Sequence, residues 1–303
     1  MKRNKLFIGS RASKLALIYA NKVKNEISKH YNKEIIIKEI NTTGDNKIDI
    51  RLSELGGKGL FSKNIENELL NKNIDLAVHA LKDLPTFDTE GLLTNCFLKR
   101  NNSNEVMISN SNKKLNDLVP GSIVGTSSFR REFQLKRIRK DLNFKLIRGN
   151  VDTRIRKLKS GEYDAIILAK AGLSSLNLDK EITQEFSNND LIPSAGQGTI
   201  AVQCRKDDVE IIELLNKINH EKTSICVKAE REVLKVLDGD CETAVGATSK
   251  IVDDKIYLSG ELFSIDGSRR YFYETSKKLS DFHMAGEEVG KKLKEESQGN
   301  YKK

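Results

Sequence analysis

Apolar positions along the first part of the chain follow two different spacings. Short apolar runs, typical of buried strands, occupy residues 5–9, 34–40 and 74–79. Between them, apolar residues recur at helical spacing over residues 15–27 and 61–69. Strands that are apolar on both faces and alternate with helices are typical of parallel sheets covered on both sides. The pattern therefore predicts an α/β unit with a parallel sheet.

The same alternation begins again near residue 105 and predicts a second α/β domain. A strand in TIAVQC (199–204) and a helix around 208–218 could return to complete the first domain. The second domain is predicted to contain strands at 105–109, 122–128, 144–149 and 164–170, with helices at 130–140 and from Val151.

The pattern changes character from about residue 220. A helix at 222–237 is followed by a polar loop, by alternating strands within 245–275 and by a final helix from Ser280. This order predicts a small α+β domain. The expected domains are residues 1–98 plus 196–218, residues 102–192, and residues 219–303.

Composition agrees with a folded protein of two or three domains. The 303 residues are 38% hydrophobic and 31% charged, which are globular values. The N-terminal segment has too short an apolar run for a signal peptide, and no run is long enough to span a membrane, so we expect a cytoplasmic protein. The four cysteines form no CxxC pair and have no histidine at zinc-ligand spacing. We therefore expect reduced thiols and no metal.

The net charge of +9 raises the possibility of a nucleic-acid partner, because basic surfaces gain from counterion release on phosphate. Aromatic residues are only 6% of the chain, tryptophan is missing, and none of the common nucleic-acid motifs occurs. Much of the excess is lysine on predicted helix faces, which favours solubility. We rank nucleic-acid binding last.

Hydroxyl and basic side chains, together with one aspartate, follow several predicted strands, where open parallel sheets bind their ligands. Helix N-termini with arginine forks suit oxyanions, and carboxylates especially. Taken singly, each of these residues is better interpreted as a helix cap or as a charge exposed to solvent. The adjacent Arg130 and Arg131 need a counter-charge, however, and the whole set predicts a ligand with several negative groups. The set comprises Arg11, Ser13, Lys82, Asp83, Thr126, Ser128, Arg130, Arg131, Arg148 and Arg154.

Asp83 is the acid in this basic setting. Its charged form would suit the stabilisation of a cationic intermediate and hydrogen bonding to N–H donors. From spacing alone, an aspartate that caps the turn before Pro85 is the better interpretation. His79 lies on an apolar strand, which favours a packed, hydrogen-bonded histidine over a catalytic base.

Two glycine-rich segments and the cysteines complete the candidates. The GGKG at 56–59 lacks the spacing of a phosphate loop and is better interpreted as a mobile loop carrying Lys58. The GQG at 196–198 is better interpreted as a tight interdomain turn, with Gln197 as a possible ligand contact. Three cysteines lie in apolar surroundings that indicate packing roles, namely Cys96, Cys204 and Cys226. Cys241 lies in a polar loop and is either incidental or reactive.

Seven motifs occur in an order that resembles the porphobilinogen deaminase family: IGSRAS, GGKGLF, AVHALKDLP, GTSSFRR, IRGNVDTRIRKL, AGQG and GDC. The resemblance spans nearly the whole chain. It implies a cytoplasmic, monomeric transferase of tetrapyrrole (haem) biosynthesis that condenses four porphobilinogen molecules head to tail, releases ammonia and hydrolyses the chain to hydroxymethylbilane. It also implies two periplasmic-binding-protein-like α/β domains plus the small C-terminal α+β domain. Each pyrrole ring carries an acetate and a propionate, which matches the expected polycarboxylate ligand.

The resemblance also implies roles for single residues. Asp83 matches the catalytic aspartate, and Cys241 matches the cysteine that holds a dipyrromethane cofactor through a thioether. The other matched positions divide into cofactor contacts (Lys82, Thr126, Ser128, Arg130 and Arg131) and substrate contacts (Arg11, Ser13, Arg148 and Arg154, with Lys58 and Gln197 as further candidates).

The chain departs from the family pattern at a few positions. Ser175 stands where arginine is common, which puts one substrate-carboxylate contact in doubt, and Ala80 stands where serine is common. Asp240, Ala244 and Glu54 are further departures. The alternative function is a non-catalytic, two-lobed binding module for a polycarboxylate ligand. Cys241 discriminates between the two, because a binding protein needs no covalent attachment.

Overall fold

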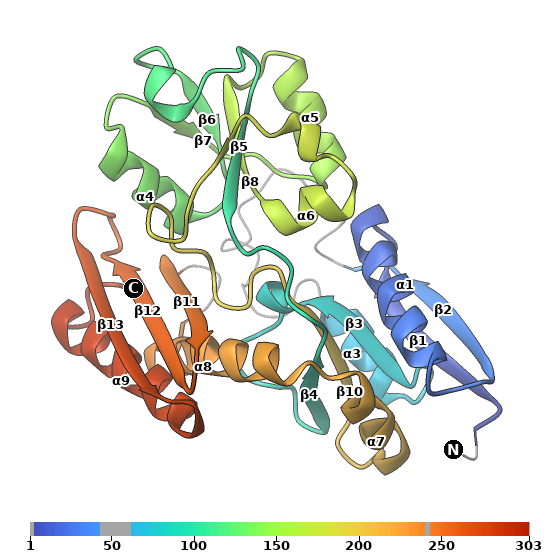
Figure 1. Cartoon of the computed structure of the whole chain (residues 1–303). Helices are drawn as coiled ribbons and strands as arrows, with labels where there is room; N and C mark the ends of the chain where they lie inside the picture. Colours follow the sequence, from blue (N-terminus) through green and yellow to red (C-terminus); the bar gives the residue numbers. More distant parts are fainter. Residues whose placement is uncertain (1–2, 43–61, 240–242, 303) are drawn as a thin grey trace.

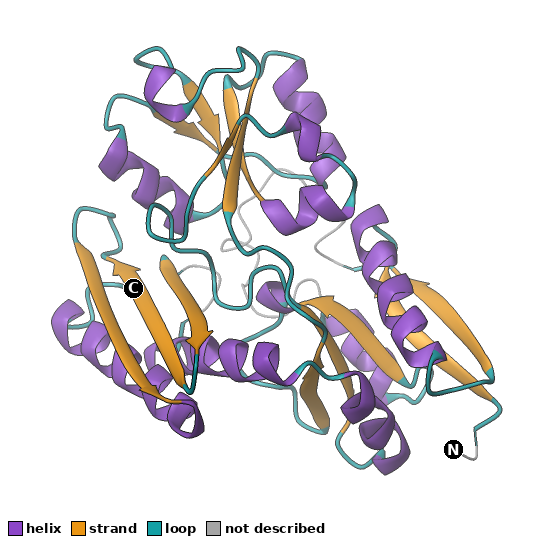
Figure 2. Ribbon diagram, in the orientation of Figure 1, coloured by secondary structure: helices purple, strands orange, loops and turns teal. Residues whose placement is uncertain are grey.

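The computed structural model describes residues 3–42, 62–239 and 243–302. Lys58, Cys241, Asp240 and Glu54 lie outside these residues. The fold contains two five-stranded sheets flanked by helices and one three-stranded sheet at the C-terminal end (Figures 1 and 2). The predicted class, two α/β units followed by a small α+β unit, is confirmed. The domain boundaries stay a prediction.

The first sheet has the strand order β2-β1-β3-β10-β4. Helices α1 and α7 pack on one face, and α3 packs with its buried Ile65 and Leu69 on the other. Both faces are therefore covered, as the apolar strands predicted. The elements are β1 (Lys5–Arg11), α1 (Lys14–Ser28), β2 (Glu34–Ile40), α3 (Lys63–Leu70), β3 (Leu76–Ala80), β4 (Leu92–Phe97), β10 (Ile200–Arg205) and α7 (Val209–Ile218).

The second sheet has the order β7-β6-β8-β5-β9. Its apolar core lies in two clusters, one around Met107 and Val124 and the other around Val106 and Ile166. The elements are β5 (Glu105–Ser109), β6 (Ile123–Gly125), α4 (Phe129–Ile138), β7 (Asn143–Lys145), α5 (Val151–Lys159), β8 (Ala165–Ala169), α6 (Lys170–Ser175) and β9 (Gln184–Glu185).

Neither five-stranded sheet is purely parallel, so the prediction of parallel sheets was wrong in part. In the first sheet, β10 runs antiparallel to β3 and β4; in the second, β5 runs antiparallel to β8 and β9. The chain enters β10 at the end where β3 leaves the sheet, since Ile200 pairs with Ala80 and the Leu81 amide donates to the Thr199 carbonyl. The chain between these two strands contains β4 and the whole second α/β unit, so β10 returns to the first sheet from that unit.

The C-terminal unit packs two helices against one face of its sheet. Strands β11 (Val245–Val252), β12 (Lys255–Phe263) and β13 (Arg270–Lys278) form a meander covered by α8 (Glu221–Leu237) and α9 (Phe282–Ser297). The helices approach closely at Gly286, where an added Cβ would lie 2.4 Å from the Ala229 carbonyl oxygen. No helix within the three described stretches is long and apolar enough to cross a bilayer.

A buried carboxylate on α8 joins the three units. Glu230 is 0% exposed and accepts hydrogen bonds from the Arg100 guanidinium (2.6 Å), the Gly196 amide (2.8 Å), and the amide and hydroxyl of Ser249 (both 2.9 Å). Arg100 and Gly196 lie in the two segments that connect the five-stranded sheets, and Ser249 lies in β11. Glu230 therefore fixes the C-terminal unit to both connections.

We expect Glu230→Ala to destabilise the protein by about 3–5 kcal/mol, because it leaves the Arg100 guanidinium without its buried counter-charge. The apparent midpoint of thermal unfolding measures the loss. Glu232→Ala is the matched control, since Glu232 lies on the same helix and makes a partly exposed ion pair with Lys235 at 3.2 Å, worth about 1 kcal/mol or less. Equal midpoints for the two variants would contradict the structural role of Glu230.

Candidate active site

The ends of β1 and β3 bring several predicted residues to one pocket. Arg11 ends β1, and Asp83 lies in the 3-10 turn η2 (Leu81–Asp83) directly after β3. The two strands are parallel neighbours, so their carboxyl ends meet at one edge of the sheet. The pocket there is lined by Arg11, Ser13, Tyr19, His79 and Asp83, among others.

The predicted hydroxyl residues begin helices. The Ser13 hydroxyl accepts from the Ala16 amide at 3.4 Å as the N-cap of α1, and the Ser128 hydroxyl accepts from the Arg131 amide at 3.5 Å as the N-cap of α4. Thr126 is buried, and its Oγ1 accepts from the Ser128 amide at 3.2 Å. The capping interpretation is therefore correct for both serines, and their ligand contacts stay a prediction.

Glu105 is the counter-charge that the adjacent arginines required. This residue begins β5, is 0% exposed, and pairs with Arg130 and Arg131 at 2.7 Å each. Burial alone would raise the pKa of Glu105, but Arg131 and Arg130 overcome that effect and lower it to about 2. The carboxylate therefore stays charged inside the second α/β unit.

The guanidinium groups of Arg130 and Arg131 have different hydrogen-bond partners. The Arg130 guanidinium also donates to the Ile192 carbonyl (2.8 Å) and to the Gln134 side chain (3.1 Å), so protein acceptors surround it. Arg131 donates to the Ile167 carbonyl at 3.2 Å, but its buried Nε has no hydrogen-bond partner among the described residues. A buried N–H without an acceptor carries a free-energy cost that a ligand oxygen could remove.

We expect Glu105→Gln to lower the thermal midpoint by several degrees at neutral pH, because it removes the charge that pairs with Arg130 and Arg131. The pKa of Glu105 is lower in the folded protein (about 2) than its ordinary value of 4.5, so its contribution is full above about pH 4.5 and is lost as the pH falls toward 2. The midpoints of wild type and variant should converge over this window. A difference that stays constant from pH 7 to pH 2 would contradict the assignment.

Lys82 lies between the two α/β units. Its Nζ donates to the Gln197 Oε1 at 3.2 Å, and the buried Gln197 donates in turn to the Ser103 carbonyl at 2.8 Å. The Lys82 side chain is exposed to solvent in part, yet neighbouring protein atoms desolvate its ammonium group. This desolvation, together with Arg131, lowers the pKa of Lys82 to about 8, against the opposing charge of Asp83.

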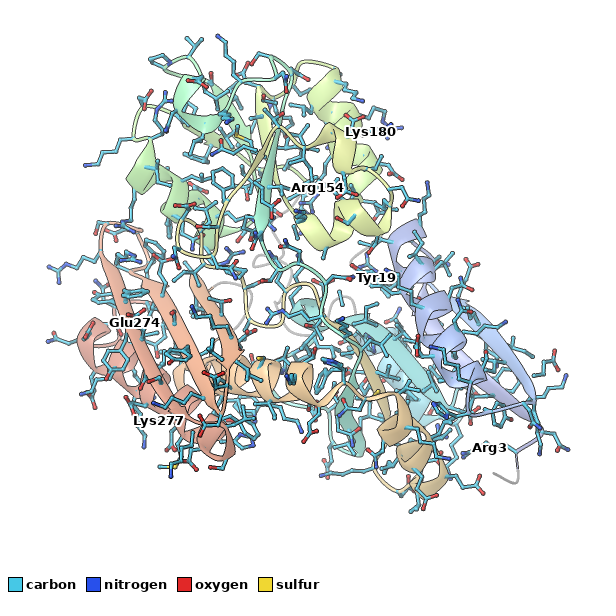
Figure 3. The ribbon with its side chains drawn as sticks, viewed as in Figure 1. Arg3, Tyr19, Arg154, Lys180, Glu274 and Lys277 are labelled. Carbon is cyan, nitrogen blue, oxygen red and sulfur yellow. The ribbon has the colours of Figure 1, made fainter. Side chains whose placement is uncertain are left out.

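Arg148 and Arg154 supply further positive charge from the second α/β unit. The Arg154 Nε donates to the Gly149 carbonyl at 2.8 Å. Desolvation lowers the pKa of Arg154 to about 10, with Arg131 and Arg148 adding to the shift and Asp83 opposing it. Burial, then Arg11, also lowers the pKa of Arg148. Figure 3 shows Arg154 on the upper unit and Tyr19 on the unit that faces it.

These mutual shifts show that cations from both units repel one another around Asp83. Arg11 and Lys82 come from the first unit, and Arg131, Arg148 and Arg154 from the second. Such a cluster is stabilised by a ligand with several negative groups. Among the residues that the structure describes, no group of histidine, cysteine or acidic side chains could hold a metal ion.

His79 is a packed residue, as its strand predicted. It is 7% exposed, and burial, with a further effect of Arg11, lowers its pKa to about 4. The ring is therefore neutral at physiological pH. Its Nε2 makes no hydrogen bond within the described residues, so the expected hydrogen bonding is not seen at that atom.

Sequence reasoning missed two residues of this region. Glu105 opens an apolar strand, and an acidic residue at the start of such a strand was the available signal. Tyr19 falls within the apolar helix predicted over residues 15–27, and helical spacing gives no indication that it also lines the pocket.

The three cysteines that the structure describes have protonated thiols. Cys96 and Cys204 are buried, and desolvation raises their pKa values to about 12 and about 11. Burial also raises the pKa of the half-buried Cys226. These thiols are poor nucleophiles, because the thiolate is the reactive form.

Two solved structures align with much of this chain at low sequence identity. A Bordetella pertussis BvgS VFT2 domain aligns with 71% of this chain and 85% of its own at 14% identity, with a TM-score of 0.43. A Salmonella typhimurium periplasmic binding protein with high arginine specificity aligns with 73% of this chain and 94% of its own at 14% identity, with a TM-score of 0.41.

Sequence comparison shows much closer relatives. Porphobilinogen deaminases of Macrococcus caseolyticus (44% identity, 88% of each chain), Bacillus pumilus (46% identity, 86% of this chain and 85% of the relative) and Staphylococcus aureus strain N315 (42% identity, 98% and 96%) match over most of their lengths. The family description "Porphobilinogen deaminase, dipyromethane cofactor binding domain" matches residues 6–213, and "Porphobilinogen deaminase, C-terminal domain" matches residues 224–298. The chain therefore belongs to the porphobilinogen deaminase family.

Proposed function

We propose that this chain is a transferase that condenses four porphobilinogen molecules head to tail, with loss of four ammonia molecules, and then hydrolyses the product to hydroxymethylbilane. The observation that carries the proposal is Asp83, a carboxylate at the carboxyl end of β3 surrounded by cations of both α/β units. Porphobilinogen offers an amine to such a carboxylate and two carboxylates to such cations.

The residues at this site fit a dipyrromethane cofactor. Its acetate and propionate groups need cationic donors, and the Arg131 Nε is buried without an acceptor among the described residues. Lys82 keeps its proton at pH 7, since its pKa is about 8. We propose Lys82, Thr126, Ser128, Arg130 and Arg131 as cofactor contacts. Arg130 contributes chiefly through its ion pair with Glu105 and its place in α4. When bound, the cofactor supplies the free pyrrole α-carbon that starts the chain. Its attachment point is Cys241.

Asp83 is the catalytic residue of the proposed reaction. Loss of ammonia from the substrate's aminomethyl group leaves an electron-poor carbon with positive charge spread onto the pyrrole nitrogen. A fixed carboxylate beside that nitrogen stabilises the charge. Asp83 begins the cycle protonated and gives this proton to the leaving amine, and the carboxylate that remains stabilises the cation. It then takes a proton back from the new ring junction, so it ends each cycle in its starting form.

The remaining cations position the substrate. Arginine forks hold carboxylates in a defined geometry and leave the pyrrole faces free for reaction. We propose that Arg11, Ser13, Arg148 and Arg154 contact the incoming ring, with Lys58 and Gln197 as further contacts. We propose that residues 1–98 plus 196–218, residues 102–192 and residues 219–303 form the three domains. We also propose that the enzyme is monomeric and cytoplasmic.

Product stoichiometry tests the proposal against a non-catalytic binding module. Purified protein incubated with porphobilinogen should release four ammonia molecules for each hydroxymethylbilane formed. Ammonia can be measured by an enzyme-coupled assay, and the linear tetrapyrrole by its acid-induced conversion to a porphyrin. Porphobilinogen binding without ammonia release would favour the binding module and overturn the proposed activity.

A further inference from the structure

Glu261 of the C-terminal unit is buried against a helix of the second α/β unit. It lies in β12, is 2% exposed, and accepts a hydrogen bond from the side-chain amide of Gln134 in α4 at 2.5 Å. It also forms ion pairs with Arg137 of α4, at 3.6 Å, and with Arg270 of β13. Carboxylates are almost never fully buried without such partners. Glu261 therefore joins β12 to α4.

Gln134 continues this contact to the arginine pair. Its Oε1 accepts from the Arg130 guanidinium at 3.1 Å, and Arg130 donates in turn to Glu105 at 2.7 Å. Glu261 and these three residues are each 4% exposed or less. A buried chain of hydrogen bonds thus runs from β12 through α4 to the carboxylate that Arg130 shares with Arg131. In the weakly screening interior, the geometry of each member of such a chain depends on its neighbours.

Apolar side chains extend the contact between α4 and the C-terminal unit. Phe133 of α4 packs with Ala244 and Phe263, and the ring centroids of the two phenylalanines lie 5.8 Å apart. Strand β11 approaches Arg130 itself, since a Cβ added at Gly246 would lie 3.2 Å from the Arg130 Cδ. Figure 1 shows α4 beside the strands of the C-terminal sheet. The helix is therefore packed on this unit, while its first turn carries proposed cofactor contacts.

Glu261 also contributes to the charge balance around α4. The guanidinium groups of Arg130 and Arg131 share the one carboxylate of Glu105. Burial lowers the pKa of Arg130; Glu105 opposes this shift, Arg131 adds to it, and Glu261 opposes it as well. The C-terminal unit thus supplies a second negative charge to the two buried arginines of the second unit.

We propose that Glu261 is a positioning residue, which holds α4 against the C-terminal unit and so keeps the cofactor contacts of α4 aligned with the attachment point of the cofactor. The proposal rests on the function proposed above. Cys241, the proposed attachment point, lies in sequence between α8 and β11 of the C-terminal unit, whereas Ser128, Arg130 and Arg131 begin α4. A group held at two points reacts efficiently only when both points keep a fixed geometry.

The stabilisation that the cofactor gives to the fold tests this inference. It is measured as the thermal midpoint of adduct-bearing protein minus that of the same protein with Cys241→Ser. Glu261→Leu should at least halve this difference, because α4 can then leave the C-terminal unit and part of the cofactor's binding free energy is used to bring it back. Leucine nearly keeps the side-chain volume and removes both the charge and the acceptor. Intact-protein mass gives the adduct content of each preparation.

Glu288→Leu is the matched control. Glu288 lies in α9 and accepts from the hydroxyls of Tyr273 (3.1 Å) and Thr275 (2.9 Å), and it pairs with Lys277 at 2.5 Å. These partners belong to the C-terminal unit itself. The control should therefore lower the midpoints of adduct-bearing and Cys241→Ser proteins by the same amount. If Glu261→Leu also lowers the two midpoints equally, its role is structural only and the inference is wrong.

Turnover gives a second measurement, which does not depend on the Cys241→Ser protein. Per adduct-bearing molecule, Glu261→Leu should lower kcat roughly tenfold and change the KM for porphobilinogen less than about threefold, because the cofactor is misplaced while the substrate contacts remain. Gln134→Leu breaks the same contact from the α4 side and should have the same effect. The double variant should be no slower than the slower single variant, since both residues act in one chain.

The wild-type protein separates this inference from the proposed function. A wild-type protein that carries no two-pyrrole adduct and releases no ammonia would refute the proposed function. A wild-type protein with adduct and turnover, together with an unchanged kcat in Glu261→Leu and Gln134→Leu, would refute only the role of Glu261.

Discussion

Replacing Asp83 with asparagine is expected to slow porphobilinogen turnover by roughly a hundredfold to ten-thousandfold, the range typical for loss of a general acid or base. Asparagine has nearly the same shape but is neutral at every pH. It can neither stabilise a cationic ring nor carry a proton between the leaving amine and the new junction. The Asp83 side chain is exposed in a short turn, so the substitution should leave the fold intact.

The measurement is the rate of ammonia release at saturating porphobilinogen, compared with the thermal midpoint of the same preparation. Asp88→Asn is the control, because Asp88 is an exposed carboxylate in the segment that follows Asp83, and its Oδ2 accepts from the Thr94 amide at 3.3 Å. That variant should keep near wild-type turnover. An Asp83→Asn enzyme within threefold of the wild type would exclude a catalytic role for the carboxylate.

The spacing of apolar residues predicted which elements form, but not every strand direction. The strand at 34–40 and the helix over 15–27 follow directly from their periodicity. Strands β5 and β10 are buried along their whole length, like the parallel strands of the same sheets, because helices cover both faces. An apolar run does not indicate from which end of the sheet the chain enters the strand. Direction was set by the connections between the units.

The rule that ligands bind at strand ends found Arg11, Lys82 and Asp83, because it depends only on recognising the strands. The rule could not predict which of Arg130 and Arg131 has a guanidinium N–H left for a ligand. Adjacent residues of a helix point about 100° apart, so one guanidinium meets Ile192 and Gln134 while the other meets Ile167 and retains an unpaired Nε. Glu105, which pairs with both, is about 25 residues distant in sequence, beyond any local pattern.

The sequence resemblance and the structure contribute different parts of the proposed site. The resemblance assigns roles to Asp83 and Cys241, which spacing alone left open. The structure adds a physical reason for the ligand's charge, since cations on two separate units lower one another's pKa values. A ligand whose carboxylates contact both units would relieve this repulsion and hold the units together.

Replacing Cys241 with serine is expected to abolish both the covalent cofactor and turnover. A thioether needs a thiol that can ionise, and burial raises the pKa values of Cys96, Cys204 and Cys226, the cysteines within the described residues. Cys241 follows Gly239 by two residues, and the Gly239 carbonyl accepts from the Thr86 hydroxyl at 2.6 Å. A hydrogen bond thus joins the segment after Asp83 to the segment before Cys241. The two residues of chain from Gly239 to Cys241 span at most about 7 Å.

Intact-protein mass and the reaction with Ehrlich's reagent measure the outcome. Wild-type enzyme should carry the mass of a two-pyrrole adduct and give a positive reaction, whereas Cys241→Ser should show neither and should release no ammonia from porphobilinogen. Cys226→Ser is the matched control, because the half-buried Cys226 is not the proposed attachment point. This variant should keep the adduct and the activity. A two-pyrrole adduct that persists in Cys241→Ser and disappears in Cys226→Ser would move the attachment point to α8 and refute the assignment of Cys241.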